Sequence, residues 1–402
     1  MSSMNFLEKL LDGVNVEWKP LGEVGVFIRG NGLQKKDFVE EGFPAIHYGQ
    51  IYTKYSLSAE NTFSFVSNEL ANKLKQAKYN DLLLATTSEN DEDVVKPLAW
   101  LGASAAISGD MMLFRHQQNV KYLAHFFKTS HFQEEKKKYI SGAKVRRVSS
   151  GDLAKIRVPI PCPDNPKKSL EIQAEIVRIL DAMTAHTAEL TAELTAELTA
   201  RKKQYNYYRD KLLIFEDGEA EWKKLGDLAE NLDSKRKPIT SGLREAGSIP
   251  YYGASGIVDY VKDYIFDGDY LLVSEDGANL LARNTPIAFS ISGKSWVNNH
   301  AHVLKFDTYA ERRYVEYYLN GIDLTPYISG AAQPKLNKKN LEGILIPNPT
   351  LNEKERIVAL LDKFDALTTS ITEGLPREIE LRQKQYAYYR DLLLSFPQAQ
   401  TA

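Results

Sequence analysis

Two stretches of the chain carry apolar residues at helical spacing over a length well beyond that of an ordinary globular helix. The first extends from about Leu170 to Phe215, and as a helix it would be ~65 Å long at 1.5 Å per residue. The second extends from about Asn352 to Phe396, but Gly374-Leu375-Pro376 interrupts it, and we expect a kink or a short break there. Because both are amphipathic and a large domain separates them in sequence, we expect them to pack as an antiparallel pair.

A short repeat lies inside the first of these predicted helices. Thr-Ala-Glu-Leu is written three times in succession between Thr187 and Leu198, with neither Gly nor Pro in the run. Four residues are close to one helical turn, so each unit lengthens the helix without altering its ends. The repeat is therefore interpreted as a spacer, and its leucines are expected to pack against the second helix: Leu190, Leu194 and Leu198.

The remaining sequence has the pattern of two mixed domains. Residues 16–160 and 220–347 contain short apolar runs bounded by turn residues, which predict strands, together with a few helices such as 120–139 and 309–320. The predicted fold is α+β, with two mixed α/β domains separated by two long antiparallel helices. The expected boundaries are 1–160 for the N-terminal segment and first domain, 161–216 for the first helix, 217–350 for the second domain, and 351–402 for the second helix and tail.

The sequence also contains an internal duplication. The frame recurs in three blocks: Trp-Lys-x-Leu-Gly at Trp18 and Trp222, Ile-Ser-Gly-Ala at Ile140 and Ile328 with an apolar strand ending in Pro159 and Pro347, and Ile-Val-x-x-Leu-Asp followed by Gln-Tyr-x-Tyr-Tyr-Arg-Asp in both long helices. Glu8-Lys9-Leu10-Leu11 near the start echoes Asp210-Lys211-Leu212-Leu213 and the ending Asp391-Leu-Leu-Leu394. Duplication of this kind predicts a pseudo-twofold, cyclic arrangement of two similar modules, and sequences that differ between the blocks indicate different targets.

Composition narrows the class of protein. Of 402 residues 43% are hydrophobic and 26% are charged, which is typical of a globular chain of more than one domain. The single cysteine, Cys162, excludes an internal disulfide framework and a cysteine zinc site. The start lacks a signal peptide, and no apolar run approaches a membrane span, so a cytoplasmic location without membrane contact is expected.

Basic residues cluster at related places in the two halves even though the net charge is only −2. The two clusters follow the Ile-Ser-Gly blocks, and their members are Lys144, Arg146 and Arg147 in the first half and Lys335, Lys338 and Lys339 in the second. Two like patches related by pseudo-symmetry suit a DNA duplex, and the alternative is a pair of ordinary solvated loops. Tyr48 and Tyr252 are candidates for the same contact surface or for core packing. Tyrosines on the long helices are assigned to helix or subunit packing: Tyr205, Tyr208, Tyr386 and Tyr389.

No convincing catalytic constellation is present in the sequence. Gly293-Lys294-Ser295 satisfies a relaxed phosphate-loop pattern, but the β-rich sequence that follows favours a turn between strands over the helix that such a loop needs. His300 and His302 are a close pair without an obvious cysteine or acidic partner set, so core or surface histidines are favoured over a metal site. We therefore expect no catalytic and no metal-binding residues, and a binding function.

The repeated frame and the spacer resemble a known family. Trp-Lys-x-Leu-Gly, Ile-Ser-Gly, Ile-Val-x-x-Leu-Asp and Gln-Tyr-x-Tyr-Tyr-Arg-Asp-x-Leu-Leu resemble the specificity subunits of type I restriction-modification enzymes, and the Thr-Ala-Glu-Leu run is similar to that of the type IC branch. The resemblance implies that each domain is a target recognition domain reading one half of a bipartite, non-palindromic sequence in double-stranded DNA, and that the long helices are spacers.

The resemblance also implies partners. Two modification subunits would dock on the chain and carry S-adenosylmethionine and adenine methylation, while restriction subunits would add ATP- and magnesium-dependent translocation and cleavage. A coiled-coil protein scaffold that binds no DNA is the rival interpretation, and a nucleotide hydrolase at Gly293-Lys294-Ser295 is a third.

Overall fold

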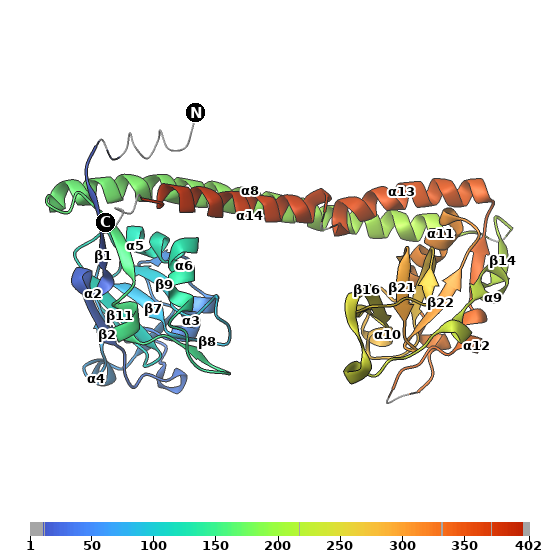
Figure 1. Cartoon of the computed structure of the whole chain (residues 1–402), viewed down its shortest axis with the longest axis horizontal. Coiled ribbons are helices and arrows are strands. Elements are labelled where there is room, and N and C mark those ends of the chain that lie inside the picture. The colour runs from blue at the N-terminus through green and yellow to red at the C-terminus, as the bar shows by residue number, and fades with distance from the viewer. Residues whose placement is uncertain (1–10, 12, 217, 331–332, 371, 397–402) are drawn as a thin grey trace. The chain divides into compact units, whose positions relative to one another are not determined.

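The computed structural model describes residues 11, 13–216, 218–330, 333–370 and 372–396. It divides into two compact units, the first comprising 1–192 and 380–402 and the second comprising 193–379. Each unit contains one mixed α/β domain and part of both long helical stretches (Figure 1).

The first unit is built on two sheets. The central five-stranded sheet has the order β2 (Gly25–Arg29), β11 (Met111–His116), β7 (Leu82–Ala85), β9 (Lys96–Trp100) and β4 (Ser58–Ala59). The second sheet has the order β5 (Ser64–Val66), β3 (Phe43–Ile46), β10 (Ala105–Ile107) and β6 (Gln76–Ala77). Two short pairs join β1 (Val16–Pro20) to β13 (Arg157–Pro161) and β8 (Thr87–Ser88) to β12 (Arg146–Arg147). The helices are α2 (Leu21–Val24), the 3-10 turn η1 (Lys35–Asp37), α3 (Tyr48–Thr53), α4 (Asn68–Ala71), α5 (Val120–Phe126), α6 (Ser130–Lys137) and α7 (Ser150–Leu153).

The second unit repeats this plan. Its central sheet has the order β15 (Glu230–Asn231), β22 (Ala301–Lys305), β19 (Tyr270–Ser274) and β20 (Ala288–Ile291). The other sheet has the order β17 (Gly256–Val261), β16 (Ala246–Gly253), β21 (Lys294–Val297) and β18 (Phe266–Asp267), and β14 (Glu221–Lys224) pairs with β23 (Leu345–Asn348). The short helices are α9 (Leu225–Leu228), η2 (Asp233–Lys235), η3 (Ser241–Leu243), α10 (Asn279–Ala282), α11 (Tyr309–Gly321), η4 (Thr325–Tyr327) and α12 (Lys338–Glu342).

The repeated frame folds identically in the two units. Trp18 of β1 lies opposite Pro159 of β13, and Trp222 of β14 lies opposite Pro347 of β23. The next backbone N–H groups, at Leu21 and Leu225, donate to carbonyls before the apolar strands at the same distance of 2.8 Å. The predicted duplication is therefore confirmed at the level of strand register.

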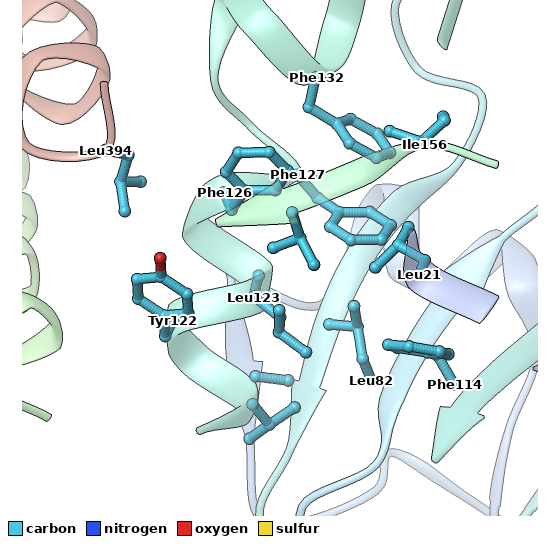
Figure 2. Close-up of a cluster of buried hydrophobic side chains, with 14 of the residues drawn as sticks. Leu21, Leu82, Phe114, Tyr122, Leu123, Phe126, Phe127, Phe132, Ile156 and Leu394 are labelled. Atoms are coloured by element: carbon cyan, nitrogen blue, oxygen red, sulfur yellow. The ribbon is translucent and has the colours of Figure 1, made fainter. Parts of the chain in front are cut away.

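A cluster of buried aromatic side chains forms the main core of the first unit. Figure 2 shows Phe126 of α5, Phe127 directly after it and Phe132 of α6 in one cluster with Leu82 and Phe114 of the central sheet. Full burial of such a side chain contributes roughly 1.5–3 kcal/mol. The helical prediction for 120–139 was wrong in one respect, because α5 and α6 are separate helices. The Thr129 side chain accepts from the Phe132 N–H and donates to the Phe126 carbonyl, so it starts α6 and ends α5 at one residue.

The first predicted long helix is a single α-helix, α8 (Pro166–Leu213), and the Thr-Ala-Glu-Leu repeat lies inside it without a break. Pro166 stands at the first helical position, where its missing N–H costs no hydrogen bond. The second long stretch is two helices, α13 (Leu351–Thr369) and α14 (Gly374–Leu393), which confirms the predicted interruption. Gly374 has φ +78°, and a Cβ there would lie 2.5 Å from the Ala366 carbonyl oxygen, so only glycine fits.

The two helical stretches are antiparallel where they meet within a unit. In the first unit Ile176 and Leu180 of α8 share a core with Leu393 and Leu394, and the Thr184 hydroxyl donates to the Tyr386 hydroxyl at 2.9 Å. Leu11 near the N-terminus belongs to the same core as Leu394, so both ends of the described chain are buried together, as the cyclic arrangement predicts. Glu8, Lys9 and Leu10 lie outside the described residues.

Candidate nucleic-acid interface

Each Ile-Ser-Gly block begins a small loop closed by paired backbone bonds, which we call the Ser-Gly loop (141–147 in the first unit, and the described residues 329–330 and 333–335 in the second). In the first unit the backbones of Ser141 and Arg147 exchange two N–H to carbonyl bonds of 2.9 Å, and in the second unit Ser329 and Lys335 exchange two of 2.8 Å. The glycine of each block has positive φ, and a Cβ there would lie under 3 Å from a carbonyl oxygen across the loop. Arg147 and Lys335 therefore occupy equivalent positions, each six residues after the serine of its block.

The basic residues of the first loop differ in availability. Lys144 and Arg147 are exposed and, among the residues that the structure describes, neither makes a salt bridge. Arg146 is half-buried, its Nε lies 2.8 Å from an Asp91 carboxylate oxygen, and its guanidinium donates to the Gly142 carbonyl. Arg146 therefore helps to hold the loop in shape, and contact of all three residues with DNA stays a prediction. The acidic run 89–93 is a loop, and one of its carboxylates, that of Asp91, is the partner of Arg146.

The basic residues of the second cluster are all exposed, with Lys335 in the Ser-Gly loop and Lys338 and Lys339 in α12. The Lys335 ammonium lies 3.1 Å from Glu275, and Lys338 lies 3.5 Å from Glu342 one helical turn later. Lys339 makes no salt bridge within the described part of the chain. The Lys338–Glu342 pair is exposed and is worth little, so Lys338 can exchange its carboxylate partner for a phosphate oxygen at small cost. The Lys335 partner, Glu275, is only 12% exposed, but Arg236 also bonds it at 2.7 Å, so that carboxylate keeps a partner when Lys335 turns to a phosphate oxygen.

A buried charged cluster supports the second Ser-Gly loop. The buried His302 ring lies with Nδ1 2.6 Å from Asp233 and Nε2 2.7 Å from the Leu336 carbonyl, and Arg236 bonds Glu275 at 2.7 Å. Burial opposes ionisation of Glu275, but bonds from Arg236 and Lys335 hold the pKa of its carboxyl below the usual value.

This cluster revises the expectation that His302 has no acidic neighbours. Ligand atoms of Asp233, Glu275 and His302 lie within 4.8 Å of one another, but the Arg236 guanidinium contacts both carboxylates. The three residues are therefore an ion-pair network around a core histidine. Sequence gave no signal for it because Asp233 and Glu275 are far from His302 along the chain.

The two candidate tyrosines are half-buried. Tyr48 begins α3 and packs against the core of the second sheet, and its backbone N–H donates to the Ser108 hydroxyl. Tyr252 packs against a core of the second unit with its ring 6.1 Å from that of Phe289. Core packing therefore accounts for most of both side chains, and their contact with DNA stays a prediction.

The residues assigned to helix packing occupy the inner faces of the long helices to different degrees. Tyr386 bonds Thr184, Tyr205 packs against the second unit's core, and the Tyr208 ring is stacked 5.8 Å from that of Phe364. The leucines of the repeat are each half-buried: Leu190, Leu194 and Leu198. Tyr389 is 40% exposed and contacts the ring of Tyr388, so it contributes least to helix packing.

Sequence reasoning missed the contacts that fasten each domain to its long helix. The aspartate that ends the Ile-Val-x-x-Leu-Asp motif is the acceptor in both units. The Asp181 carboxylate of α8 forms a salt bridge with Lys121 of α5 and lies 3.3 Å from the His125 ring of the same helix. The Asp362 carboxylate of α13 accepts hydrogen bonds of 2.6–3.1 Å from three side chains of α11: Tyr309, Arg313 and Tyr317. Burial opposes ionisation of Asp181, but bonds from His125 and Lys121 hold the pKa of its carboxyl below the usual value. The repetition of this aspartate in the motif was the available signal.

The phosphate-loop string is a short connection between two strands. Ser292 and Gly293 connect β20 to β21, and Lys294 and Ser295 belong to β21, which is a strand. The prediction of a turn between strands is confirmed, and the helix N-terminus that a phosphate loop requires is replaced by this strand. In the part of the chain that the structure describes, no helix is long and apolar enough to cross a membrane.

Comparison with known proteins agrees with this architecture. Residues 14–200 and 218–381 each match the family described as the type I restriction modification DNA specificity domain. The type I restriction enzyme EcoR124I/EcoR124II specificity subunit of Escherichia coli is 38% identical over 100% of this chain and 99% of its own length. The EcoprrI specificity subunit of Escherichia coli is 34% identical over 93% of each chain.

A solved structure shows the same fold. A chain from a study of complex assembly and conformational transition of the type I restriction-modification system superposes with a TM-score of 0.63, at 14% identity, over 94% of this chain and 97% of that one. With two family domains in one chain and full-length relatives at this identity, the protein belongs to the family of type I restriction-modification specificity subunits.

Proposed function

We propose that this chain reads a bipartite, non-palindromic DNA sequence, one half-site per domain, and directs partner subunits to methylate or cut the DNA. The observation that carries the proposal is the repeated Ser-Gly loop. It presents basic side chains at equivalent positions in two domains whose other sequences differ. Identical frames suit the repeating phosphates of a duplex, and dissimilar loops suit two different base sequences.

In this proposal the chemistry belongs to the partners. Two modification subunits would supply S-adenosylmethionine and adenine methylation, and restriction subunits would supply ATP- and magnesium-dependent translocation and cleavage. The chain itself contributes recognition and spacing and no catalytic residue. A chromosomal DNA target also agrees with the cytoplasmic location expected from the sequence.

Duplex affinity measured against salt tests the proposal. The near-neutral net charge implies that the chain alone binds weakly and that the modification subunit supplies much of the electrostatic attraction. We expect the chain with its modification subunit to bind duplex DNA with an affinity that falls linearly on a double-logarithmic plot against salt. Absence of any salt-sensitive affinity after the modification subunit is added would instead identify the chain as a protein scaffold.

A further inference from the structure

We propose that each domain reads bases with the end of its central sheet that lies away from the long helices. At that end, the loop that follows β7 in the first unit, and the loop that follows β19 in the second, pairs with the Ser-Gly loop of the same unit. In the second unit the structure assigns this role to Asp276 and His300. The inference rests on the proposed function and specifies which side chains carry it.

The opposite end of each central sheet is occupied by the frame. In the first unit, residues just beyond β11 contact α8: the Asn119 N–H donates to Gln173 at 2.9 Å, and Gln118 bonds the same side chain. In the second unit β22 leads directly into α11, and Tyr309 at the start of α11 bonds Asp362 of α13. The other end of each sheet makes none of these contacts with the long helices, and we assign the duplex to it.

At the free end of the central sheet of the first unit, hydrogen bonds join four loops into one surface. The Thr86 N–H after β7 donates to the Asp110 carbonyl before β11, and Arg29 at the end of β2 donates to Gly109. Next to these, Thr87 and Ser88 pair with the Ser-Gly loop through β8 and β12.

This surface carries many basic side chains. Asn31 extends it by accepting from the Lys75 N–H and donating to the Lys73 carbonyl. Seven exposed basic residues surround these loops, and none makes a salt bridge with a described residue: Arg29, Lys35, Lys36, Lys73, Lys75, Lys144 and Arg147. The acidic run 89–93 follows β8, and its Asp91 is paired with Arg146, so the feature that suits a polyanion is the number of basic side chains without a carboxylate partner.

The free end of the central sheet of the second unit is built in the same way but carries different side chains. The Glu275 N–H after β19 donates to the His300 carbonyl before β22, and Asp276 forms a backbone bridge with Lys335 of the Ser-Gly loop. Lys235 and Lys237, in and just after η2, are exposed beside Arg236, which is bonded to Glu275. The order of the loops around the sheet end is therefore the same in both units, whereas the residues they carry differ.

Asp276 and His300 have the chemistry of base readers. The His300 ring is half-exposed, and its Nδ1 lies 2.8 Å from the Asp276 carboxylate, which fixes the ring and leaves Nε2 for a base edge. Asp276 is itself partly exposed, and a carboxylate oxygen accepts from the cytosine amino group. The Ser-Gly loop beside them supplies Lys335 for the phosphate backbone, so backbone positioning and base reading come from adjacent loops of one surface.

The test uses the full chain assembled with its modification subunit, with methylated motifs mapped genome-wide and duplex affinity measured against salt. His300→Ala and Asp276→Ala should each relax the base preference at one or two neighbouring positions of one half-site, with about a tenfold loss for the cognate duplex. Lys335→Ala should reduce the salt slope by about one without changing the preferred bases. Lys305→Ala removes an exposed charge at the opposite end of the same sheet and should change neither.

The unchanged half-site serves as the folding control in each variant, because the first domain still has to bind. A motif identical to the wild type in both His300→Ala and Asp276→Ala would overturn the inference, as would a motif altered by Lys305→Ala alone. If the wild-type complex itself produces no motif and no salt-sensitive binding, the proposed function fails, which is a distinct result.

Discussion

Removal of one Thr-Ala-Glu-Leu unit should shorten the gap between the two half-sites and leave both half-sites unchanged. The unit Thr191–Leu194 lies inside the continuous helix α8, so its removal joins two helical segments without a new break. Four residues correspond to ~6 Å along the helix axis and to ~400° of rotation, or about 40° beyond a full turn.

Both quantities convert into base pairs. One base pair advances ~3.4 Å along B-DNA. With ~10 base pairs per turn it also rotates the duplex by about 35°. The rotation therefore matches one base pair closely, while the translation lies between one and two. Angular mismatch would point a reading surface away from its groove, so we expect a gap shorter by one base pair, or at most two.

The assay maps methylated adenines in cells that produce the shortened chain with its modification subunit. The matched control replaces Thr191–Leu194 by four other helix-forming residues, which keeps the length of α8 and should leave the gap unchanged. An altered half-site after the deletion, or an unaltered gap, would refute the spacer interpretation.

Three further predictions concern stability. Asp362→Ala should lower the free energy of unfolding by about 2 kcal/mol, because it leaves hydrogen-bond donors of the Arg313 cluster without an acceptor; an unchanged urea midpoint would contradict the docking role. Burial lowers the pKa of Lys136 from 10.5 to about 8. Between these pH values the unfolded chain binds more protons than the folded chain, so the free energy of unfolding should rise from pH 8 to 10.5 relative to Lys136→Met, by up to about 3 kcal/mol. Parallel pH profiles of the two proteins would contradict a lowered pKa of Lys136. Gly374→Ala should reduce the melting temperature more than Gly218→Ala, because both glycines have positive φ but only the first would clash with carbonyl oxygens; equal shifts would disprove the packing argument.

The sequence predicted those parts of the fold that local pattern and duplication determine. The long helices follow from helical spacing, the break at Gly374 follows from residues that disfavour a helix, and the equivalence of Arg147 and Lys335 follows from the repeated frame. The division between α5 and α6 was missed because Thr129 fits a helix interior as well as a cap until its hydrogen-bond partners are known.

The candidate site was less predictable because its properties depend on residues distant in sequence. Arg146 forms a salt bridge with Asp91, and His302 lies beside carboxylates and a guanidinium from two other loops. Asp276 and His300 meet only because strands β19 and β22 are neighbours in the sheet. The charge and periodicity of a sequence predict the properties of one segment at a time, whereas a DNA-reading surface is formed by several segments that meet only in the folded chain.

The most direct test of the account is the sequence motif methylated by this chain together with its modification subunit. Methylated adenines mapped in a host that lacks other systems should define two fixed, dissimilar half-sites separated by a gap of constant length. Methylation without any shared motif, or a single continuous palindromic motif, would contradict the conclusion that two different domains each read one half of the target.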